Sequence, residues 1–337
     1  MKKVFKISGI VLGVIVFLAA SFIGVWFMWP WHGEFYDNAY AEFLIPGLEH
    51  KFVPQAFTKI DNQNKFVVGG YMSDGSASRF YIVNEETKEA EKFFTLTIDG
   101  EDYVGHACGV ASSGNNMWTC SNDGEGGTAY RFLLSDVESV LDGESVEVKD
   151  SFATNNGADN IMVSDNMLWI GEFYRKGNYE TDETHHIETR SGEINTAVTF
   201  GYELDSTQEN GLKDTIPDKA ISTLGLVQGV AITEEGNIIL STSYSLSAST
   251  IYCYENVLVE EKHSTIKVGE VDVDLWFLDS ESLINKVSAP AMTEEIIAYN
   301  GKLYILNESA CKKYKLFTRD SVKDVYSLPI DYVVGNK

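Results

Sequence analysis

The chain has 337 residues, of which 44% are hydrophobic and 12% aromatic, so it can bury a large core and does not have the composition of a disordered protein. It carries 26 Lys and Arg against 50 Asp and Glu, a formal net charge of −24. Such an acidic field argues against nucleic acid and anionic lipid as partners, and favours cations or simple solubility.

The N-terminal segment predicts a membrane helix. Residues 7–29 contain no charged residue and are long enough to cross a hydrocarbon core of roughly 30 Å. Lys2, Lys3 and Lys6 precede this run and no acidic residue does, so the positive-inside tendency keeps the N-terminus cytoplasmic. We therefore expect a single-pass protein of the cell membrane, with the membrane as its partner through this helix and most of the chain extracytoplasmic.

A cleaved signal peptide is the alternative to a retained anchor. Residues 39–41 read Ala-Tyr-Ala, as cleavage sites do, yet this triplet lies well beyond the apolar run, so we favour the anchor over cleavage after Ala41. The expected organisation follows in chain order. Residues 1–31 form the cytoplasmic tip and transmembrane anchor, residues 32–51 a juxtamembrane segment with a candidate closing strand, and residues 52–337 one folded domain.

Five segments of the domain resemble one another. Each contains two short apolar or aromatic runs separated by Asn, Asp, Gly or Glu, which tolerate the positive φ of tight hairpins, so each predicts an antiparallel hairpin. The paired runs are 53–58 with 65–71, 107–111 with 116–120, 158–163 with 167–172, 227–232 with 237–242, and 293–298 with 302–307. A sustained repeat of this kind indicates a repeat architecture.

Further apolar runs follow the hairpins. Third runs lie at 79–83, 130–134, 275–278 and 314–317, and fourth runs at 92–96 and 325–329. Four antiparallel strands per repeat are typical of a propeller blade, so the predicted fold is an all-β, five-bladed β-propeller preceded by one N-terminal transmembrane helix. Six blades are the alternative if 173–226 or 243–292 contains another, and a two-sheet sandwich is the weaker one. Residues 173–196 and 249–272 are expected to be insertions after second strands.

One repeat carries a resemblance to known proteins. Residues 227–231 read Val-Gln-Gly-Val-Ala and are followed by a Gly236-Asn237 turn and an apolar strand. In this pattern the sequence is similar to bacterial members of the broad propeller superfamily that includes gluconolactonase-like and strictosidine-synthase-like proteins. The resemblance covers most of 52–330 and implies a propeller with a central pocket that often holds calcium. The early Glu-x-Pro of the lactonase group is absent, and Val53-Pro54-Gln55 stands nearest to it.

Polar residues recur near the start of the predicted innermost strands. These strands line the central channel of a propeller, so polar residues at their ends are expected to share one binding site. The candidate binding residues are Gln55, His106, Asp159, Asn160, Gln228, Glu294 and Glu295. A small polar ligand or a cation is the expected occupant.

Calcium is the candidate cofactor, because it takes six to eight oxygen ligands from carboxylates, amides and water. Asp159, Asn160, Gln228 and Glu295 are the candidate metal ligands. His106 is the candidate catalytic residue, since an imidazole can act as a general base near neutral pH. Glu172, Glu308 and the His185-His186 pair are interpreted instead as solvent-exposed residues.

Four cysteines, in an oxidising compartment, permit disulfides in three connectivities. Cys108 and Cys120 are equidistant from Gly114 and are expected to face each other across a hairpin, while Cys253 and Cys311 follow second strands of adjacent repeats. Two functions therefore stay open. We favour a ligand-binding or interaction module on the membrane; the alternative is a calcium-assisted hydrolase of small esters or lactones, because propellers host both.

Overall fold

The structure is a computed structural model, and it describes residues 13–18, 21, 32–122 and 126–335. The chain divides into two compact units, Met1–Asp37 and Asn38–Lys337. In the first unit residues 13–18 are helical and α2 (Gly33–Asn38) begins after His32. The predicted span at 7–29 lies largely outside the described residues. Among those described, no helix combines the length and the apolar character needed to cross a membrane.

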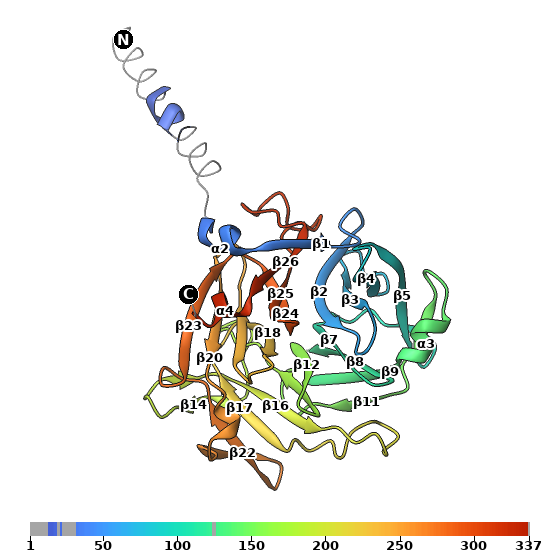
Figure 1. Ribbon diagram of the computed structural model, residues 1–337, viewed down its shortest axis with the longest axis vertical. Coiled ribbons are helices and arrows are strands. Elements are labelled where there is room, and N and C mark those ends of the chain that lie inside the picture. The colour runs from blue at the N-terminus through green and yellow to red at the C-terminus, as the bar shows by residue number, and fades with distance from the viewer. Residues whose placement is uncertain (1–12, 19–20, 22–31, 123–125, 336–337) are drawn as a thin grey trace, which may run out of the picture. The chain divides into compact units, whose positions relative to one another are not determined.

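The second unit is a five-bladed β-propeller, which confirms the predicted fold class (Figure 1). The first blade contains β2 (Phe52–Lys59), β3 (Lys65–Met72), β4 (Arg79–Asn84) and β5 (Ala90–Ile98). The second contains β7 (Gly109–Ser113), β8 (Asn116–Asn122), β9 (Gly127–Leu133) and β11 (Asp150–Ala153). The third contains β12 (Asn160–Ser164), β13 (Met167–Gly171), β16 (Ala197–Glu203) and β17 (Lys219–Thr223).

The fourth blade contains β18 (Val227–Ile232), β19 (Ile238–Thr242), β20 (Ser249–Tyr254) and β23 (Leu283–Ala289). The fifth contains β24 (Thr293–Tyr299), β25 (Lys302–Asn307), β26 (Asp324–Pro329) and β1 (Tyr40–Leu44). β1 pairs antiparallel with β26, so an N-terminal strand completes the last blade. The inner strands β2, β7, β12, β18 and β24 each contact the next, and β24 contacts β2, which closes the ring.

Two blades receive extra strands from the neighbour that follows them in the chain. After β9, helix α3 (Leu134–Ser139) leads to β10 (Ser145–Glu147), which pairs parallel with β5 of the first blade; β6 (Glu101–Asp102) also pairs with β5. After β20, helix η2 (Val257–Val259) leads to β21 (Ser264–Val268) and β22 (Val271–Phe277), and β22 pairs parallel with β17. These additions cover strand edges that would otherwise be exposed.

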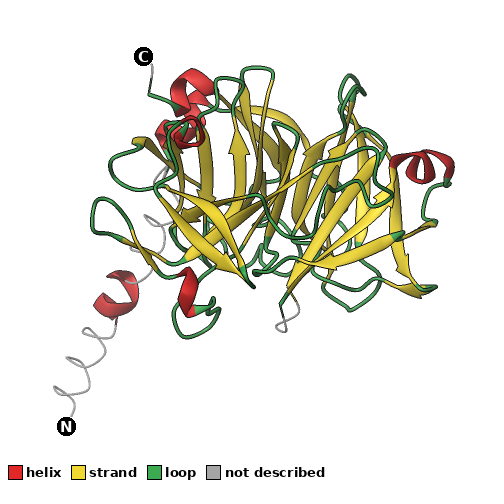
Figure 2. Cartoon of the chain, turned by 90° about the horizontal axis from the view of Figure 1, so that it is seen from below, coloured by secondary structure: helices red, strands yellow, loops and turns green. Residues whose placement is uncertain are grey.

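The remaining elements are short. η1 (Glu183–His185), β14 (Ile187–Glu188) and β15 (Ile194–Asn195) lie within the stretch 172–196, between the second and third strands of the third blade, where an insertion was expected. α4 (Ile330–Val333) follows β26. Figure 2 shows how few helices accompany the strands.

Several strand predictions were wrong about position within a blade. Residues 249–254 are the third strand of the fourth blade, so its insertion comes after the third strand and not after the second. Residues 275–278 fall in or next to β22, residues 314–317 form turns, and residues 325–329 belong to a third strand because β1 supplies the fourth. Most of the apolar runs identified strands, although 314–317 is a largely exposed turn, and the runs carry no information about which partner a strand will find.

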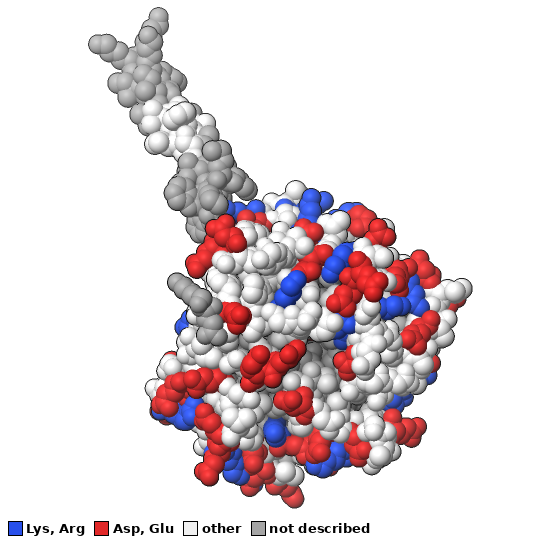
Figure 3. All heavy atoms as spheres, in the orientation of Figure 1, with Lys and Arg blue, Asp and Glu red and all other residues white. Residues whose placement is uncertain are grey.

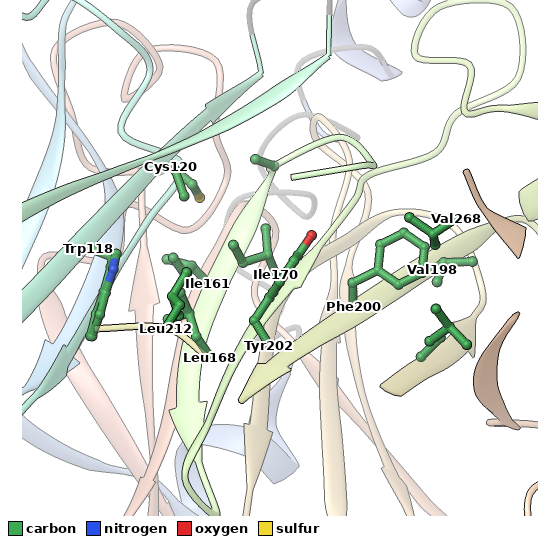
Figure 4. Close-up of a cluster of buried hydrophobic side chains, with 14 of the residues drawn as sticks. Trp118, Cys120, Ile161, Leu168, Ile170, Val198, Phe200, Tyr202, Leu212 and Val268 are labelled. Atoms are coloured by element: carbon green, nitrogen blue, oxygen red, sulfur yellow. The ribbon is translucent and has the colours of Figure 1, made fainter. Parts of the chain in front are cut away.

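The core lies between the blades. Trp118, Trp169 and Tyr304 each occupy the third position of a second strand, are at most 4% exposed, and pack in different inter-blade clusters, as their equivalence predicted. Figure 4 shows the cluster in which Trp118 and Cys120 of the second blade meet Leu168, Ile170 and Tyr202 of the third. Because the faces of each blade are covered by its neighbours, the inner strands are apolar on both sides.

Candidate functional site

A cavity of about 480 Å³ opens at the N-terminal ends of the inner strands. Its wall includes a residue at or near the start of each of the five inner strands: Gln55, His106, Asp159, Gln228 and Glu294. They lie up to 239 positions apart in the sequence, and the radial arrangement of the blades brings them together. The size of the cavity suits a small molecule.

Backbone irregularities direct three of these side chains. The pairing register shifts between Pro54 and Ala56 in β2, between Val227 and Gly229 in β18, and between Thr293 and Ile296 in β24. The residues skipped by the strand pairing at these three places are Gln55, Gln228, and Glu294 with Glu295. A β-bulge re-aims a side chain relative to the regular alternation of a strand, so the bulges explain why polar residues of apolar strands line the cavity.

The residues that lead into three inner strands adopt a left-handed conformation. Ala107, Leu226 and Met292 have φ of 50°, 66° and 65°, and none is Gly or Asn. Such positions cost of order 1–3 kcal/mol each and are concentrated at functional sites. Their recurrence at the same place in three blades shows that the cavity mouth is built with backbone strain.

Glu294 and Glu308 form a carboxyl pair on the cavity wall. Glu308 follows β25, the strand that pairs with β24, and the two side chains are hydrogen-bonded to each other. Gln55 Nε2 of the first blade donates to Glu308 Oε2 at 3.0 Å. Burial raises the pKa of Glu308 to about 8 and, together with the neighbouring Glu308, raises that of Glu294 well above its usual range. The pair therefore holds a proton at neutral pH.

Tyr71 and Lys313 lie beside this pair. Lys313 Nζ donates to the Tyr71 hydroxyl at 2.6 Å and lies over the rings of Tyr71 and Tyr314. The Tyr71 ring also stacks on His106, with ring centroids 4.3 Å apart. Burial raises the pKa of Tyr71. Lys313 is thus hydrogen-bonded to Tyr71 and not to the carboxyl pair, although its positive charge acts to lower the pKa of Glu308.

His106 is exposed at the cavity mouth. Partial burial of its ring among the wall residues and the positive charge of Lys313 lower its pKa to about 4. Its Nδ1 lies 3.7 Å from Cys108 Sγ, and no carboxylate of the described chain is hydrogen-bonded to its ring. The imidazole is therefore neutral at pH 7 and a weak base, without the orienting carboxylate that a catalytic His normally has. Its catalytic role stays a prediction.

Asp159 is held at the start of β12. Its carboxylate accepts from the Phe173 amide at 2.8 Å and from Asn122 Nδ2 at 3.3 Å. Burial raises its pKa to about 6, against the effect of these hydrogen bonds. At pH 7 Asp159 is predominantly ionised, so it supplies the cavity with negative charge.

Asn160 and Glu295 do not line the cavity. Both are 1% exposed and lie among the inner strands. Within the described chain, Asn160 Nδ2 and both Glu295 carboxyl oxygens lack a hydrogen bond of regular geometry. The Val110 and Phe57 amides are near enough to lower the pKa of Glu295, but burial outweighs them and keeps it well above the usual range. Glu295 is accordingly a neutral acid in the core of the ring.

The candidate calcium ligands are thereby divided between two environments. Asp159 and Gln228 face the cavity, whereas Asn160 and Glu295 are buried beside it. The described residues contain no group of three or more His, Cys, Asp or Glu side chains placed to hold a metal ion. Calcium stays a prediction.

Aromatic and apolar side chains form the outer wall of the cavity, and the sequence did not single them out. They include Phe173 and Tyr179 from the insertion in the third blade, Tyr244 and Leu246 after β19, and Tyr314 and Phe317 after β25. Phe317 is 72% exposed and Leu246 54%. These wall residues could have been identified in the sequence from their position directly after second strands. The loops that follow second strands converge at one end of the ring.

A second cavity of about 780 Å³ adjoins the first and shares His106, Asp159 and Phe173 with it. Glu172 and His185 also line it, and they are buried instead of solvent-exposed as predicted. His185 Nδ1 lies 2.8 Å from Glu172 Oε1, which also accepts from the Val198 amide at 2.9 Å. Glu308, the third residue interpreted as exposed, is partly buried on the wall of the first cavity.

All four cysteines are free and buried, so the expected bridge between Cys108 and Cys120 is not formed. The turn of this hairpin consists of Gly114 and Asn115, which pairs Gly109 with Cys120. Cys108 is therefore one residue out of register, and a shift of one residue turns side chains to opposite faces. The other two thiols, Cys253 and Cys311, are free as well.

Charged groups are scattered over the face of the molecule that Figure 3 shows. Figure 3 shows Asp and Glu spread over the visible face with Lys and Arg among them, and not gathered in one patch. The acidic excess is thus a general property of this face.

No known family profile matches the sequence, and no curated protein is similar to it in sequence. Among solved structures it resembles the PQQ-bound aldose sugar dehydrogenase of Streptomyces coelicolor, with a TM-score of 0.47 and 10% identity over 86% of this chain and 97% of that one. The likeness is one of fold.

Two other solved structures are similar at the same level. Myxococcus xanthus glutaminyl cyclase matches with a TM-score of 0.43 and 10% identity, over 80% of this chain and 91% of that one. Kuenenia stuttgartiensis hydrazine synthase matches with a TM-score of 0.37 and 8% identity over 75% of this chain. The match covers 55% of the hydrazine synthase chain, so the present chain spans about half of that protein's length.

Proposed function

We propose that the propeller is a binding module that captures a small polar molecule in the cavity at the end of its inner strands. The observation that carries the proposal is the gathering of Gln55, His106, Asp159, Gln228 and Glu294, from all five blades, on one wall. A group of polar side chains with an aromatic outer wall suits a ligand that is polar at one end and apolar at the other.

We further propose that residues 1–31 anchor this module in the cell membrane and display it outside the cell. The uncharged run 7–29 after three lysines supports this orientation. The position of β1 supports retention of the anchor, because cleavage after Ala41 would cut this strand between residues paired with Tyr326 and Val325. Intact mass measurement of the membrane-extracted protein tests it. A mature protein that begins at Glu42 would contradict a retained anchor.

Binding is tested by thermal unfolding of the full chain in detergent micelles. The probes are a panel of small organic amines, sugars and carboxylic acids, together with calcium chloride, which also tests the hydrolase alternative. A probe that occupies the cavity raises the Tm of the wild type by mass action. The double variant Asp159→Asn with Glu294→Gln should lose that rise.

The matched control changes the same residue types at exposed positions, Asp102→Asn with Glu261→Gln, and should respond as the wild type does. A probe that stabilises all three proteins equally binds elsewhere. If no probe in the panel stabilises the wild type, the binding proposal is abandoned.

A further inference from the structure

The Glu294–Glu308 pair makes no ion pair within the described chain, although the charge of the nearby Lys313 acts to lower the pKa of Glu308. No Lys, Arg or His nitrogen lies in ion-pair contact with either carboxyl, although 17 ion pairs of this kind are made elsewhere among the described residues. Among the described residues, the Gln55 amide is the one N–H donor directed at the pair, and it reaches Glu308. Glu294 is 3% exposed, faces the cavity, and receives no hydrogen bond from an N–H group of the described residues.

A shared proton takes the place of the missing cation. Two carboxylates in a confined site repel each other unless one is protonated or a cation neutralises both. An ammonium group that entered the cavity could donate to both carboxylates, and the shared proton would then be released. The exchange balances: the amine brings one positive charge, and one proton leaves for the solvent.

The outer wall favours a cation with an apolar substituent. Phe173, Tyr244 and Phe317 line the same cavity as the carboxyl pair, and aromatic faces attract organic cations as well as apolar groups. A calcium ion would need six to eight oxygen ligands and would leave this aromatic wall unused. An organic amine uses both parts of the cavity.

We propose that the ligand is a small organic amine whose ammonium group binds between Glu294 and Glu308 and displaces the proton that they share. This inference rests on the proposed binding function and adds the chemical class of the ligand and the proton coupling. The affinity for the amine should therefore increase as the pH rises, because the shared proton is then given up more readily.

Other titratable groups surround the carboxyl pair, on the strands and segments packed around it. Tyr71 from β3 and Cys311 from the segment after β25 are neutral, because burial raises the pKa of both. Glu295 on β24 and Cys108 before β7 are neutral for the same reason. Lys313 and Tyr314 face the pair from the segment after β25.

His106 and Asp159, which line the same cavity, have pKa values of about 4 and about 6. Between pH 7 and pH 8 the carboxyl pair is therefore the group that exchanges a proton, since the pKa of Glu308 is about 8. Above that range Glu308 is already ionised, so the release of its proton on binding should fade.

Isothermal titration of the full chain in detergent micelles tests the inference with phenethylamine as the probe. Titrations at pH 7 in buffers of different ionisation enthalpy should show release of about one proton per amine bound, and the association constant should rise close to tenfold per pH unit until about pH 8. The neutral analogue 2-phenylethanol should bind more weakly and release no proton.

The variant Glu294→Gln should bind phenethylamine more weakly than the wild type, because the ammonium group loses one of its two carboxylate acceptors while Glu308 remains protonated by burial until an amine binds. Glu308→Gln provides the same test from the other side if the first variant is unstable, and Glu261→Gln should behave as the wild type. Proton release in the wild type can be measured whether or not either variant folds.

Three results would overturn the inference. They are binding of phenethylamine without proton release, equal binding of 2-phenylethanol, and failure of phenethylamine to bind. In each case the binding module itself still stands if a sugar or a carboxylic acid stabilises the wild type and not the cavity double variant. Failure of every probe overturns both proposals.

Discussion

Glu172 and His185 lie 2.8 Å apart in the interior, and this contact ties the insertion of the third blade to the end of β13. Glu172 also accepts from the main-chain amides of Gly157 and Val198. The Glu172 carboxylate thus contacts three hydrogen-bonding groups from three segments that meet beside the second cavity. A buried group with several partners of this kind is costly to alter, because its partners are then left unsatisfied.

The variant Glu172→Gln is expected to lower the free energy of unfolding by about 3 kcal/mol, since an amide nitrogen would be directed at donors that need an acceptor. Residues 174–196 should also become more sensitive to proteolysis. Urea denaturation and limited proteolysis followed by mass spectrometry measure the two effects. The exposed Glu188→Gln, in the same insertion, is the control, and equal behaviour of the two variants would show that the contact contributes nothing.

The closing strand provides a prediction that depends on pH. Glu42 accepts from Lys302 Nζ at 2.7 Å and from Ser327 Oγ at 2.6 Å. Burial acts to raise the pKa of Glu42, but these hydrogen bonds and the charges of Lys302 and Lys88 outweigh it and lower the pKa below 4.5. A carboxyl with a lowered folded-state pKa stabilises the protein above its unfolded value and loses that effect as pH falls through the folded value.

Glu42→Gln should therefore reduce the free energy of unfolding by roughly 1 kcal/mol at pH 7, and the difference from the wild type should shrink steadily below pH 4.5. Tm measured across this range gives the comparison, with Glu261→Gln as the control. A difference that stays constant down to pH 3 would mean that the ionised carboxylate is not what holds β1.

Trp169 supports the contact between the third and fourth blades. It is 1% exposed and shares a cluster with Ile221, Val230 and Trp276. Trp169→Ala is expected to lower the free energy of unfolding by about 3–5 kcal/mol. Trp169→Phe should cost much less, because the indole Nε1 makes no hydrogen bond with the described chain and its loss leaves no partner unsatisfied. Chemical denaturation separates the two, and similar losses for Phe and Ala would contradict this explanation.

The cysteines give a prediction about oxidation. All four are buried and free, and burial raises the pKa of the Cys253 thiol to about 12. The native protein should react slowly with a thiol reagent, and the denatured protein should then label at four positions even after isolation under oxidising conditions. Mass spectrometry after alkylation counts them. A peptide in which Cys108 is linked to Cys120 would contradict the register found here.

Local sequence determined the repeating part of the fold. Asp165-Asn166 and Asn300-Gly301 adopt the positive φ values that their residue types allow, and the hairpins form around these turns. Trp118, Trp169 and Tyr304 could be matched from sequence because position within a hairpin fixes which face a side chain occupies. The number of blades followed from counting hairpins.

Pairing between distant segments was not encoded in these local patterns. β10 and β22 add to the edges of preceding blades, and β1 completes the last one, because an unpaired strand edge is satisfied by whichever segment the folded chain brings to it. The cysteine prediction was wrong by one residue for a related reason. Symmetry about Gly114 does not specify whether a turn contains two residues or three.

In the candidate site, too, some features follow from the local sequence and others only from the tertiary structure. The sequence by itself placed Gln55, His106, Asp159, Gln228 and Glu294 at the starts of the inner strands, because the repeat aligns them. Only the tertiary structure decided that bulges direct Gln55 and Glu294 toward the cavity, that Glu308 joins Glu294, and that Asn160 and Glu295 are buried beside them. The physical reason is that a strand's sequence sets the alternation of its side chains, whereas burial, pairing register and the neighbours that shift a pKa depend on segments brought together by closure of the ring.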